Sequence, residues 1–577
     1  MIGKHIWASV LGMVLIALLP MSLQAKTGCA DLRDACAAAG FVGAGVQGKG
    51  GRIVRDCVNP LLSGVTPPGN GKLALPKVAA KSIAECKAAR ATKAKTEAAA
   101  TNGKAVGNKP VAAIALPEGV DPGPNIVLVL VDDFSMNLMP DNLGELAKSM
   151  PNLAQMRREG MTFDNYFVTD SLCCPSRTSI FTGLFPHNSG VYTNSPPDGG
   201  LSAFMEHGNA ARTFAVALHD GFYATAMMGK YLNGYQPEAG VPQGWSEWAV
   251  AGNGYANYNY TLNHNGTLIR PDLHMTDELA QLGQAFITSA AGPFFLELST
   301  FSPHGPYVPP HRYAKAFRDA RYPRSPAFGA RPDAAAPKWL QAVPPLDTRA
   351  ETRIDEIYRL RLQSVKGVDD MIGAIRTTLD EQGLAGDTYV IFTSDNGFHM
   401  GEYSLRPGKM TPFDTDIHMP LVIIGPGVAA GSRNGDITMN IDLYPTILDL
   451  AGLPAAPTVD GHSLQPALTG KPGPERTIAV IEHRGIGANP DDPDAPDPTT
   501  VDPPTYVALR MADTLYVEYL DGSGEVGFYD MKTDPDQLHN IAATLSKDRL
   551  QAMHEAATAN HSCAGAADCG AAQALAP

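Results

Sequence analysis

The chain has 577 residues and a formal net charge of −14, with 44% hydrophobic and 18% charged residues. This balance excludes an intrinsically disordered protein, because the apolar material suffices for a large core. No interior stretch of about 20 apolar residues occurs, which excludes a membrane protein with several spans. The acidic balance also argues against nucleic acid as a partner, since such a protein would need a concentrated basic face.

Residues 1–25 have the pattern of a secretory signal peptide. Lys4 and His5 precede an apolar run from Ala8 to Leu19, and Ala25 ends a small-residue cleavage site. The alternative is an uncleaved membrane anchor, although the run is short for a span. We therefore expect a periplasmic or secreted protein.

The cysteines support an oxidising compartment. Six of the eight form two sets, one near each end of the chain, and they are Cys29, Cys36, Cys57, Cys86, Cys563 and Cys569. We predict disulfides within each set, but the four N-terminal cysteines allow three connectivities between which the sequence does not choose. Cys173 and Cys174 are adjacent and lack an obvious partner, so a chemical explanation is needed for them.

The part of the chain before residue 121 differs in charge from the rest. Residues 26–120 hold 14 Lys and Arg against 6 Asp and Glu, a net charge of +8. We interpret residues 26–87 as a small cysteine-containing module and residues 88–123 as a linker rich in Ala, Lys and Pro. The module could bind an acidic polymer, a cell wall or a partner. The alternative is a solvated, disulfide-braced appendage.

The main domain begins at residue 124 with strand-like runs. Ile126–Val131 is continuously apolar, which is typical of a strand buried on both faces in a parallel sheet. Similar runs occur at Pro293–Leu298, Tyr389–Thr393 and Pro420–Gly425, and an amphipathic helical pattern covers Ile354–Leu379. Strands that alternate with helices over this length predict a large α/β sandwich.

Shorter strand-like pieces follow residue 475. Thr505–Arg510 and Thr514–Tyr519 predict a smaller antiparallel subdomain, for which we assign residues 475–545. An insertion rich in Asp and Pro, Asn489–Pro504, is expected to be a surface loop, and residues 546–577 form an Ala-rich tail.

Oxygen-bearing side chains follow two of the predicted strands. Asp132 and Asp133 follow the first strand, and Asp395 and Asn396 follow the strand near residue 390. In open α/β sheets, binding sites form at the carboxyl ends of strands. Three carboxylates and an amide there would suit a hard dication, Ca²⁺ or Mg²⁺. Alternatively, each pair is a local helix cap or turn.

The adjacent cysteines open a helical segment. Pro175 suits the first turn of a helix and Gly183 suits its end. Cys173 would then lie at a helix N-terminus, which favours an anion. Arg177 lies in the same turn and can offer paired hydrogen bonds to a tetrahedral oxyanion. From these residues alone we expect a thiolate nucleophile beside a metal.

The segment Cys173-x-Pro175-Ser176-Arg177, followed by Thr182-Gly183, resembles the signature of the type I, formylglycine-dependent sulfatases of the alkaline phosphatase superfamily. The resemblance extends over residues 125–542 and includes Gly229–Asn233, Tyr258–Leu262, Ser302–Pro306, Ser394–His399 and Phe528–Asn540. The first two of these segments are most similar to the N-acetylglucosamine-6-sulfatase branch. The resemblance implies a large mixed, mainly parallel sheet sandwiched by helices, with a smaller C-terminal antiparallel subdomain and a catalytic domain over residues 124–474.

The resemblance also implies the site. A formylglycine-generating enzyme would oxidise Cys173 to formylglycine, whose hydrate is both nucleophile and metal ligand. The other metal ligands would be Asp132, Asp133, Asp395 and Asn396, and Ca²⁺ is favoured over Mg²⁺. Arg177 would stabilise the hydrate, Lys230 and Lys409 would bind sulfate oxygens, and His304 would be the general acid.

This sequence departs from the family at one position. Many sulfatases have a histidine two residues after the first active-site lysine, where this chain has Leu232. Asn233 or His187 could supply the proton relay instead, although His187 could equally be a local cap. His399 and Glu402 follow the metal-binding strand and are expected to contact substrate, with Glu402 at a sugar hydroxyl.

The predicted activity is hydrolysis of a sulfate monoester on a sugar or aryl group. A diol is better suited than serine to this reaction, because its second hydroxyl expels sulfate without attack by water. The alternatives are a formylglycine-dependent phosphonate monoester or phosphodiester hydrolase, a catalytically silent protein that binds sulfated glycans, and a hydrolase that uses Cys173 unmodified as a thiolate.

Overall fold

The computed structural model describes residues 123–575 except 253 and 486–500, together with a few isolated positions before residue 84. The residues from 123 onward all belong to one of the chain's two compact units. The predicted signal peptide, most of the module including Cys29, Cys36, Cys57 and Cys86, and most of the linker and insertion lie outside the described residues.

Ten strands form the main sheet in the order β10-β2-β9-β8-β1-β7-β3-β4-β5-β6. They are β1 (Asn125–Val131), β2 (Met161–Phe167), β3 (Ala224–Lys230), β4 (Glu247–Ala251), β5 (Leu262–His264), β6 (Thr267–Ile269), β7 (Phe294–Ser299), β8 (Thr388–Ser394), β9 (Leu421–Ile424) and β10 (Ser432–Met439). The central strands from β8 to β4 are parallel. The sheet is therefore mixed and mainly parallel, as predicted.

One predicted strand runs in an unexpected direction. The run Pro420–Gly425 forms β9, which is antiparallel to both of its neighbours, β8 and β2. A continuous apolar run indicates a strand that is buried on both faces of a sheet, but it does not indicate the direction of that strand. The other three runs form β1, β7 and β8, which are parallel to one another.

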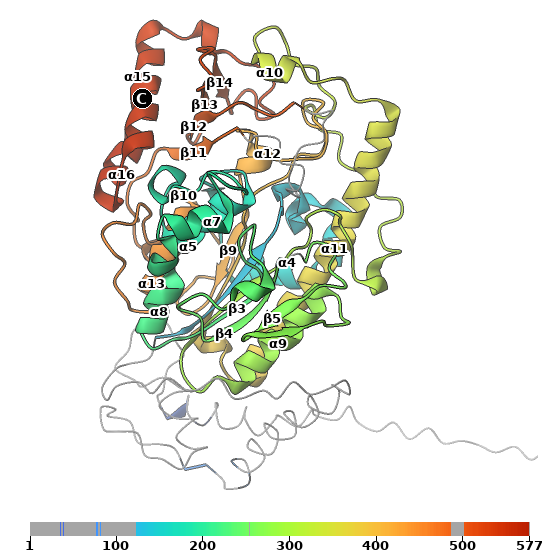
Figure 1. Cartoon of the computed structure of the whole chain (residues 1–577), viewed down its shortest axis with the longest axis vertical. Helices are drawn as coiled ribbons and strands as arrows, with labels where there is room; N and C mark the ends of the chain where they lie inside the picture. Colours follow the sequence, from blue (N-terminus) through green and yellow to red (C-terminus); the bar gives the residue numbers. More distant parts are fainter. Residues whose placement is uncertain are drawn as a thin grey trace, which may run out of the picture. The chain divides into compact units, whose positions relative to one another are not determined.

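Helices cover both faces of the main sheet, and alternate residues of β1 pack against the two helix layers. Even-numbered residues Ile126, Leu128 and Leu130 pack in one core with helices α5 (Cys173–Thr182), α8 (Phe214–Asp220) and α13 (Leu443–Leu450). Odd-numbered Val127, Val129 and Val131 pack with α4 (Pro151–Glu159), α9 (Met275–Ser289) and α11 (Thr348–Glu381). Figure 1 shows these two helix layers on either side of the strands.

The predicted helix at 354–379 is the middle of α11, which begins earlier. Asp347 caps it by accepting a 2.7 Å hydrogen bond from the backbone N–H of Ala350. The remaining short helices of this region are α6 (Pro186–Ser189), α7 (Gly200–Glu206), α10 (Lys338–Gln341), α12 (Asp414–Ile417) and α14 (Gln465–Leu468). None of the helices that the structure describes is long and apolar enough to cross a membrane.

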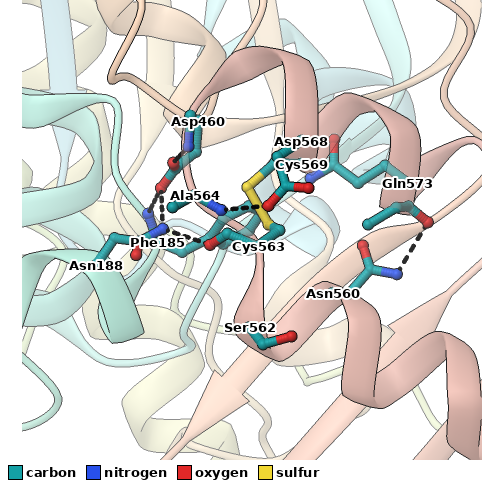
Figure 2. The surroundings of a disulfide bond; sticks show 12 residues. Phe185, Asn188, Asp460, Asn560, Ser562, Cys563, Ala564, Asp568, Cys569 and Gln573 are labelled. Carbon is teal, nitrogen blue, oxygen red and sulfur yellow. Dashed lines mark hydrogen bonds between the residues drawn. A yellow bond between two sulfur atoms is a disulfide. The ribbon is translucent and has the colours of Figure 1, made fainter.

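A second sheet follows, with four antiparallel strands in sequence order: β11 (Ala479–His483), β12 (Tyr506–Arg510), β13 (Thr514–Tyr519) and β14 (Val526–Asp530). This confirms the antiparallel C-terminal subdomain. The Ala-rich tail forms α15 (Lys547–Ser562) and α16 (Ala566–Gln573). Cys563, directly after α15, and Cys569, within α16, form the predicted disulfide, shown in Figure 2.

Candidate active site

The two sets of oxygen-bearing side chains predicted to bind a metal meet because β1 and β8 are parallel neighbours, with Val131 opposite Ser394. The residues that follow these strands therefore leave the same edge of the sheet. The backbone N–H of Asp133 donates to Asp395 Oδ1 over 3.2 Å, and Asn396 Nδ2 donates to Asp133 Oδ1 over 2.7 Å. All of these side chains are buried.

Cys173 is brought to this edge by helix α5. The helix begins at Cys173 and ends at Thr182, and the capping residue Gly183 has a φ of 69° that glycine readily adopts. Cys173 Sγ lies 3.3 Å from Asp132 Oδ1 and 2.9 Å from Lys409 Nζ, and the cysteine is fully buried. Cys174 is buried as well, and neither cysteine forms a disulfide.

Three cations each pair with one of the three carboxylates. The pairs are Lys230 with Asp132 at 2.6 Å, Lys409 with Asp133 at 2.8 Å, and Arg177 with Asp395 at 2.7 Å. Lys230 is the last residue of β3, which is parallel to β1 and separated from it by β7, so Lys230 leaves the sheet at the same edge.

Lys230 remains charged although it is buried. Burial alone would lower the pKa of Lys230, but the neighbouring Asp132 carboxylate and Cys173 raise it, and the net pKa lies well above its ordinary value. The charged Lys230 side chain is therefore stabilised by its carboxylate partner and not by solvent.

The donor set fits a hard dication. Asp132, Asp133, Cys173 and His304 each place one ligand atom within 4.8 Å of the others. In addition, Asp133 Oδ2 and Asn396 Oδ1 are buried oxygens without a hydrogen-bond donor. Unsatisfied buried acceptors cost free energy, and a cation that accepts their lone pairs would offset that cost.

His304 follows β7 and faces the same group. Its Nδ1 lies 2.8 Å from the carbonyl oxygen of Gly305, which can only accept, so Nδ1 carries a hydrogen. Its Nε2 lies 3.8 Å from Asp133 Oδ2, and its ring centre lies 4.6 Å from that of Tyr255. The ring is therefore oriented with Nε2 toward the carboxylates.

A cavity of about 660 Å³ opens beside Lys230, which is the only Lys, Arg, His, Asp or Glu among its described lining residues. The remaining polar lining is uncharged and includes Asn194, Asn233, Gln236 and Tyr255. The cavity therefore combines one buried cation with neutral hydrogen-bonding groups and aromatic rings.

Residues 124–453 match the sulfatase family. Over 476 residues the chain is 34% identical to N-acetylglucosamine-6-sulfatase of Homo sapiens, an alignment that covers 77% of this chain and 85% of that protein. The chain belongs to the sulfatase family. It is also 31% identical to an arylsulfatase of Volvox carteri, over 57% of this chain and 56% of that protein. These findings confirm the resemblance carried by the Cys173–Gly183 segment.

Solved structures share the sulfatase fold. One, described as a complex with its substrate D-glucosamine-2-N,6-O-disulfate, superposes with a TM-score of 0.64 and 24% identity over 75% of this chain and 96% of the other. A phosphonate monoester hydrolase of Agrobacterium radiobacter superposes with a TM-score of 0.57 and 22% identity, over 76% and 96%. At these identities the likeness concerns the fold alone.

His187 is not brought into the sulfatase cluster around Cys173. Its Nδ1 contacts Glu482, and its Nε2 lies 2.9 Å from the carbonyl oxygen of Cys563. The alternative relay residue, Asn233, lines the cavity beside Lys230, as Leu232 does. Of the two relay candidates, Asn233 is therefore the one that the fold places near the cluster.

His399 supports the loop that carries Lys409. Its Nδ1 lies 2.9 Å from Asp416 Oδ2, and its backbone pairs with Gly408. Burial lowers the pKa of His399, but the charge of Asp416 raises it, and the net shift is upward. The Asp416 carboxylate therefore stabilises the charged form of the ring.

Glu402 lies away from the cavity at Lys230. Its two oxygens accept hydrogen bonds from the hydroxyl of Tyr322 at 2.6 Å and the backbone N–H of Met400 at 2.7 Å. It lines a different cavity, of about 720 Å³, together with Tyr322. In this arrangement Glu402 braces the loop, and no observation places it at a substrate hydroxyl.

Two residues near the site were not identified from the sequence. Arg361 of α11 is fully buried and donates a 2.6 Å hydrogen bond to the carbonyl oxygen of Asp133, whose φ of 64° is unusual for a non-glycine residue. In the sequence, a charged residue on the apolar face of the predicted helix would have indicated Arg361. Tyr255, whose ring centre lies 5.1 Å from Lys230 Nζ, had no such signal.

Proposed function

We propose that this sulfatase-family protein hydrolyses a sulfate monoester of a sugar or aryl compound, with formylglycine at position 173 and a divalent cation. The observation that carries the proposal is the buried position of Cys173 between Asp132 and Lys409. A sulfate ester is anionic, and developing negative charge is best stabilised by preorganised cations in a buried site.

The cation would be held by Asp132, Asp133, Asp395, Asn396 and residue 173. It would supply Lewis-acid stabilisation of the charge on the sulfate oxygens. The set consists largely of oxygen ligands, which favours Ca²⁺ or Mg²⁺ over transition metals, and we propose Ca²⁺.

The formylglycine hydrate would supply two hydroxyls, one to attack sulfur and one to help expel sulfate. Lys409 contacts position 173 directly and would orient it. Lys230 lies between Asp132 and the cavity and would bind a sulfate oxygen. His304 keeps the hydrogen on Nδ1 for the Gly305 carbonyl, so its doubly protonated form would donate the Nε2 proton to the leaving alcohol oxygen.

For the substrate we propose a sugar with a 6-O-sulfate ester, of the N-acetylglucosamine type. Relatives named N-acetylglucosamine-6-sulfatase support this choice. The cavity volume of about 660 Å³ falls in the range of small-ligand sites. Its neutral polar lining suits hydroxyl and amide groups.

We also propose that the chain is exported and that a formylglycine-generating enzyme modifies Cys173. The signal-like residues 1–25 and the disulfide between Cys563 and Cys569 support export. These steps would place the mature enzyme in the periplasm or outside the cell.

The modification has a direct mass signature. In protein exported from a host with a formylglycine-generating enzyme, the tryptic peptide Glu159–Arg177 is expected to show the loss that converts a thiol to an aldehyde. Fragmentation should place the change at Cys173 and leave Cys174 intact. An unmodified cysteine pair in fully active protein would contradict the formylglycine proposal.

Substrate turnover separates this reaction from its closest alternative. We expect kcat/KM for an aryl sulfate to exceed that for the matching aryl phosphonate by at least about tenfold, which corresponds to about 1.4 kcal/mol of transition-state stabilisation. 6-O-sulfated N-acetylglucosamine should be hydrolysed as well. Faster turnover of the phosphonate would identify a phosphonate hydrolase, and no turnover by formylglycine-containing protein would favour a glycan-binding role.

Chelation tests the cation. Exhaustive dialysis against a chelator is expected to abolish turnover, because the charge of the sulfate would then be met by the three side-chain cations alone. Ca²⁺ should restore more activity than Mg²⁺ at equal concentration. A circular dichroism spectrum of the metal-free protein serves as the control for folding. Full activity in protein shown by elemental analysis to be metal-free would refute the metal proposal.

A further inference from the structure

A second group of metal-ligating side chains lies apart from the cluster around Cys173. His187 of α6, Glu482 of β11 and His561 of α15 each place one ligand atom within 4.8 Å of the others. These residues come from three elements that are distant in sequence. The group is unused by the proposed sulfatase reaction.

Glu482 is the centre of the group and is almost completely buried, with 2% of its side chain exposed. Its Oε1 contacts His187 Nδ1 and lies 2.9 Å from His561 Nδ1. Its Oε2 accepts a 3.1 Å hydrogen bond from the backbone N–H of His187. The backbone thus fixes the carboxylate with Oε1 facing both imidazoles.

The outer nitrogen of His187 is also fixed. Nε2 lies 2.9 Å from the carbonyl oxygen of Cys563, to which Asn188 Nδ2 donates as well. A carbonyl oxygen only accepts, so Nε2 carries a hydrogen, and in the neutral ring the lone pair is then on Nδ1. A ring whose second nitrogen donates to a backbone carbonyl is the usual arrangement of metal-binding histidine.

We propose that His187 Nδ1, Glu482 Oε1 and His561 Nδ1 bind Zn²⁺ or a similar transition-metal dication. Two imidazole nitrogens and one carboxylate are ligands typical of zinc, with water as the fourth ligand. His561 has 40% of its side chain exposed, which leaves an entry path and room for that water. The nitrogen-rich set distinguishes this site from the oxygen-rich cluster that suits Ca²⁺.

The metal would fasten the C-terminal tail to the catalytic domain. α15 carries His561, and Cys563 lies two residues beyond it. Figure 2 shows the Cys563 carbonyl next to Asn188, with Asp460 beside them, at the place where the tail contacts the region of α6. The zinc site and the disulfide would therefore secure the same part of the tail, where α15 ends and α16 follows.

Zinc binding to three full-length proteins tests the proposal: the wild type, His561→Ala and His554→Ala. His554 is the matched control, because it lies on the same helix and pairs with Glu518 at 2.7 Å outside the group. With excess Ca²⁺ present to occupy the oxygen-rich cluster, we expect equilibrium dialysis to show one more Zn²⁺ on the wild type and His554→Ala than on His561→Ala. The zinc affinity of that extra site should fall at least about tenfold on loss of the ligand.

Thermal unfolding gives an independent readout. Zn²⁺ should raise the Tm of the wild type and of His554→Ala, since a ligand that binds only the folded state stabilises it. It should leave the Tm of His561→Ala and of Glu482→Gln unchanged. Equal zinc binding by the three dialysed proteins with equal Tm shifts in all four, or no zinc-dependent shift in any, would show that the group is only hydrogen-bonded. Because sulfate ester hydrolysis is not measured, failure here leaves the proposed function untouched.

Discussion

Replacing Cys173 by Ser is expected to lower multiple-turnover hydrolysis of a sulfate ester by at least about 10³-fold, as for the loss of other catalytic nucleophiles. Serine offers one hydroxyl in the position held between Asp132 and Lys409. That hydroxyl can accept a sulfo group, but no second hydroxyl remains on the same carbon to expel it. Intact-protein mass spectrometry should therefore show a variant that carries one sulfo group after incubation with substrate.

The neighbouring cysteine provides the matched control. Cys174 is also fully buried, but its backbone N–H donates to Asn194 and its thiol is not part of the group around Asp132. Burial raises the pKa of Cys174 to about 12, so it stays a neutral thiol. Cys174→Ser should retain formylglycine and most of the turnover. Wild-type turnover in Cys173→Ser, or equal losses in both variants, would refute the nucleophile assignment.

Replacing Arg177 by Ala is expected to lower the free energy of unfolding by about 3–5 kcal/mol, because it leaves a buried carboxylate without its partner. Arg177 is fully buried, and its Nε pairs with Asp395 at 2.7 Å. One of its terminal nitrogens donates to Ser299 Oγ at 2.6 Å and to the carbonyl oxygen of Lys230 at 3.1 Å. Turnover should also fall, because Asp395 and Lys230 both lose a fixed neighbour.

Chemical denaturation compares this variant with one at an exposed arginine. Arg312 pairs with Asp277 and Asp370, but 41% of its side chain is exposed. Arg312→Ala should therefore cost less than about 1 kcal/mol. Arg177→Lys is expected to fall between the two, since it keeps the charge and loses the planar hydrogen-bonding geometry. An unfolding midpoint for Arg177→Ala equal to that of Arg312→Ala would contradict the importance of the buried pair.

Much of the site could be predicted because its parts are short and local. The apolar run of β1 ends directly at Asp132 and Asp133, and a strand boundary is visible in such a run. Likewise, Pro175 and Gly183 delimit α5 through backbone preferences that act within one helix. The meeting of the two strand ends followed from one general rule, that parallel strands present their carboxyl ends at one edge.

Other features depend on contacts between distant segments. The roles expected for His187 and Glu402 rested on their position near a motif, and the fold turned these side chains toward Glu482 and Tyr322. The hydrogen bond that Arg361 donates to the carbonyl oxygen of Asp133 joins residues 228 apart in the chain. No local pattern encodes which partner a polar side chain meets, because that partner is chosen by the packing of whole elements.

The sequence by itself determined the α/β class, the burial of the central strands, the start of α5 at Cys173 and the residue types that meet at the sheet edge. These properties follow from hydrophobic periodicity and backbone preference, which act over a few residues. Only the tertiary structure decided the direction of β9, the ion pairs of Lys230 and Lys409, and the group formed by His187, Glu482 and His561. Strand direction and side-chain pairing depend on how distant segments pack against one another. Patterns that extend over a few residues do not encode that packing.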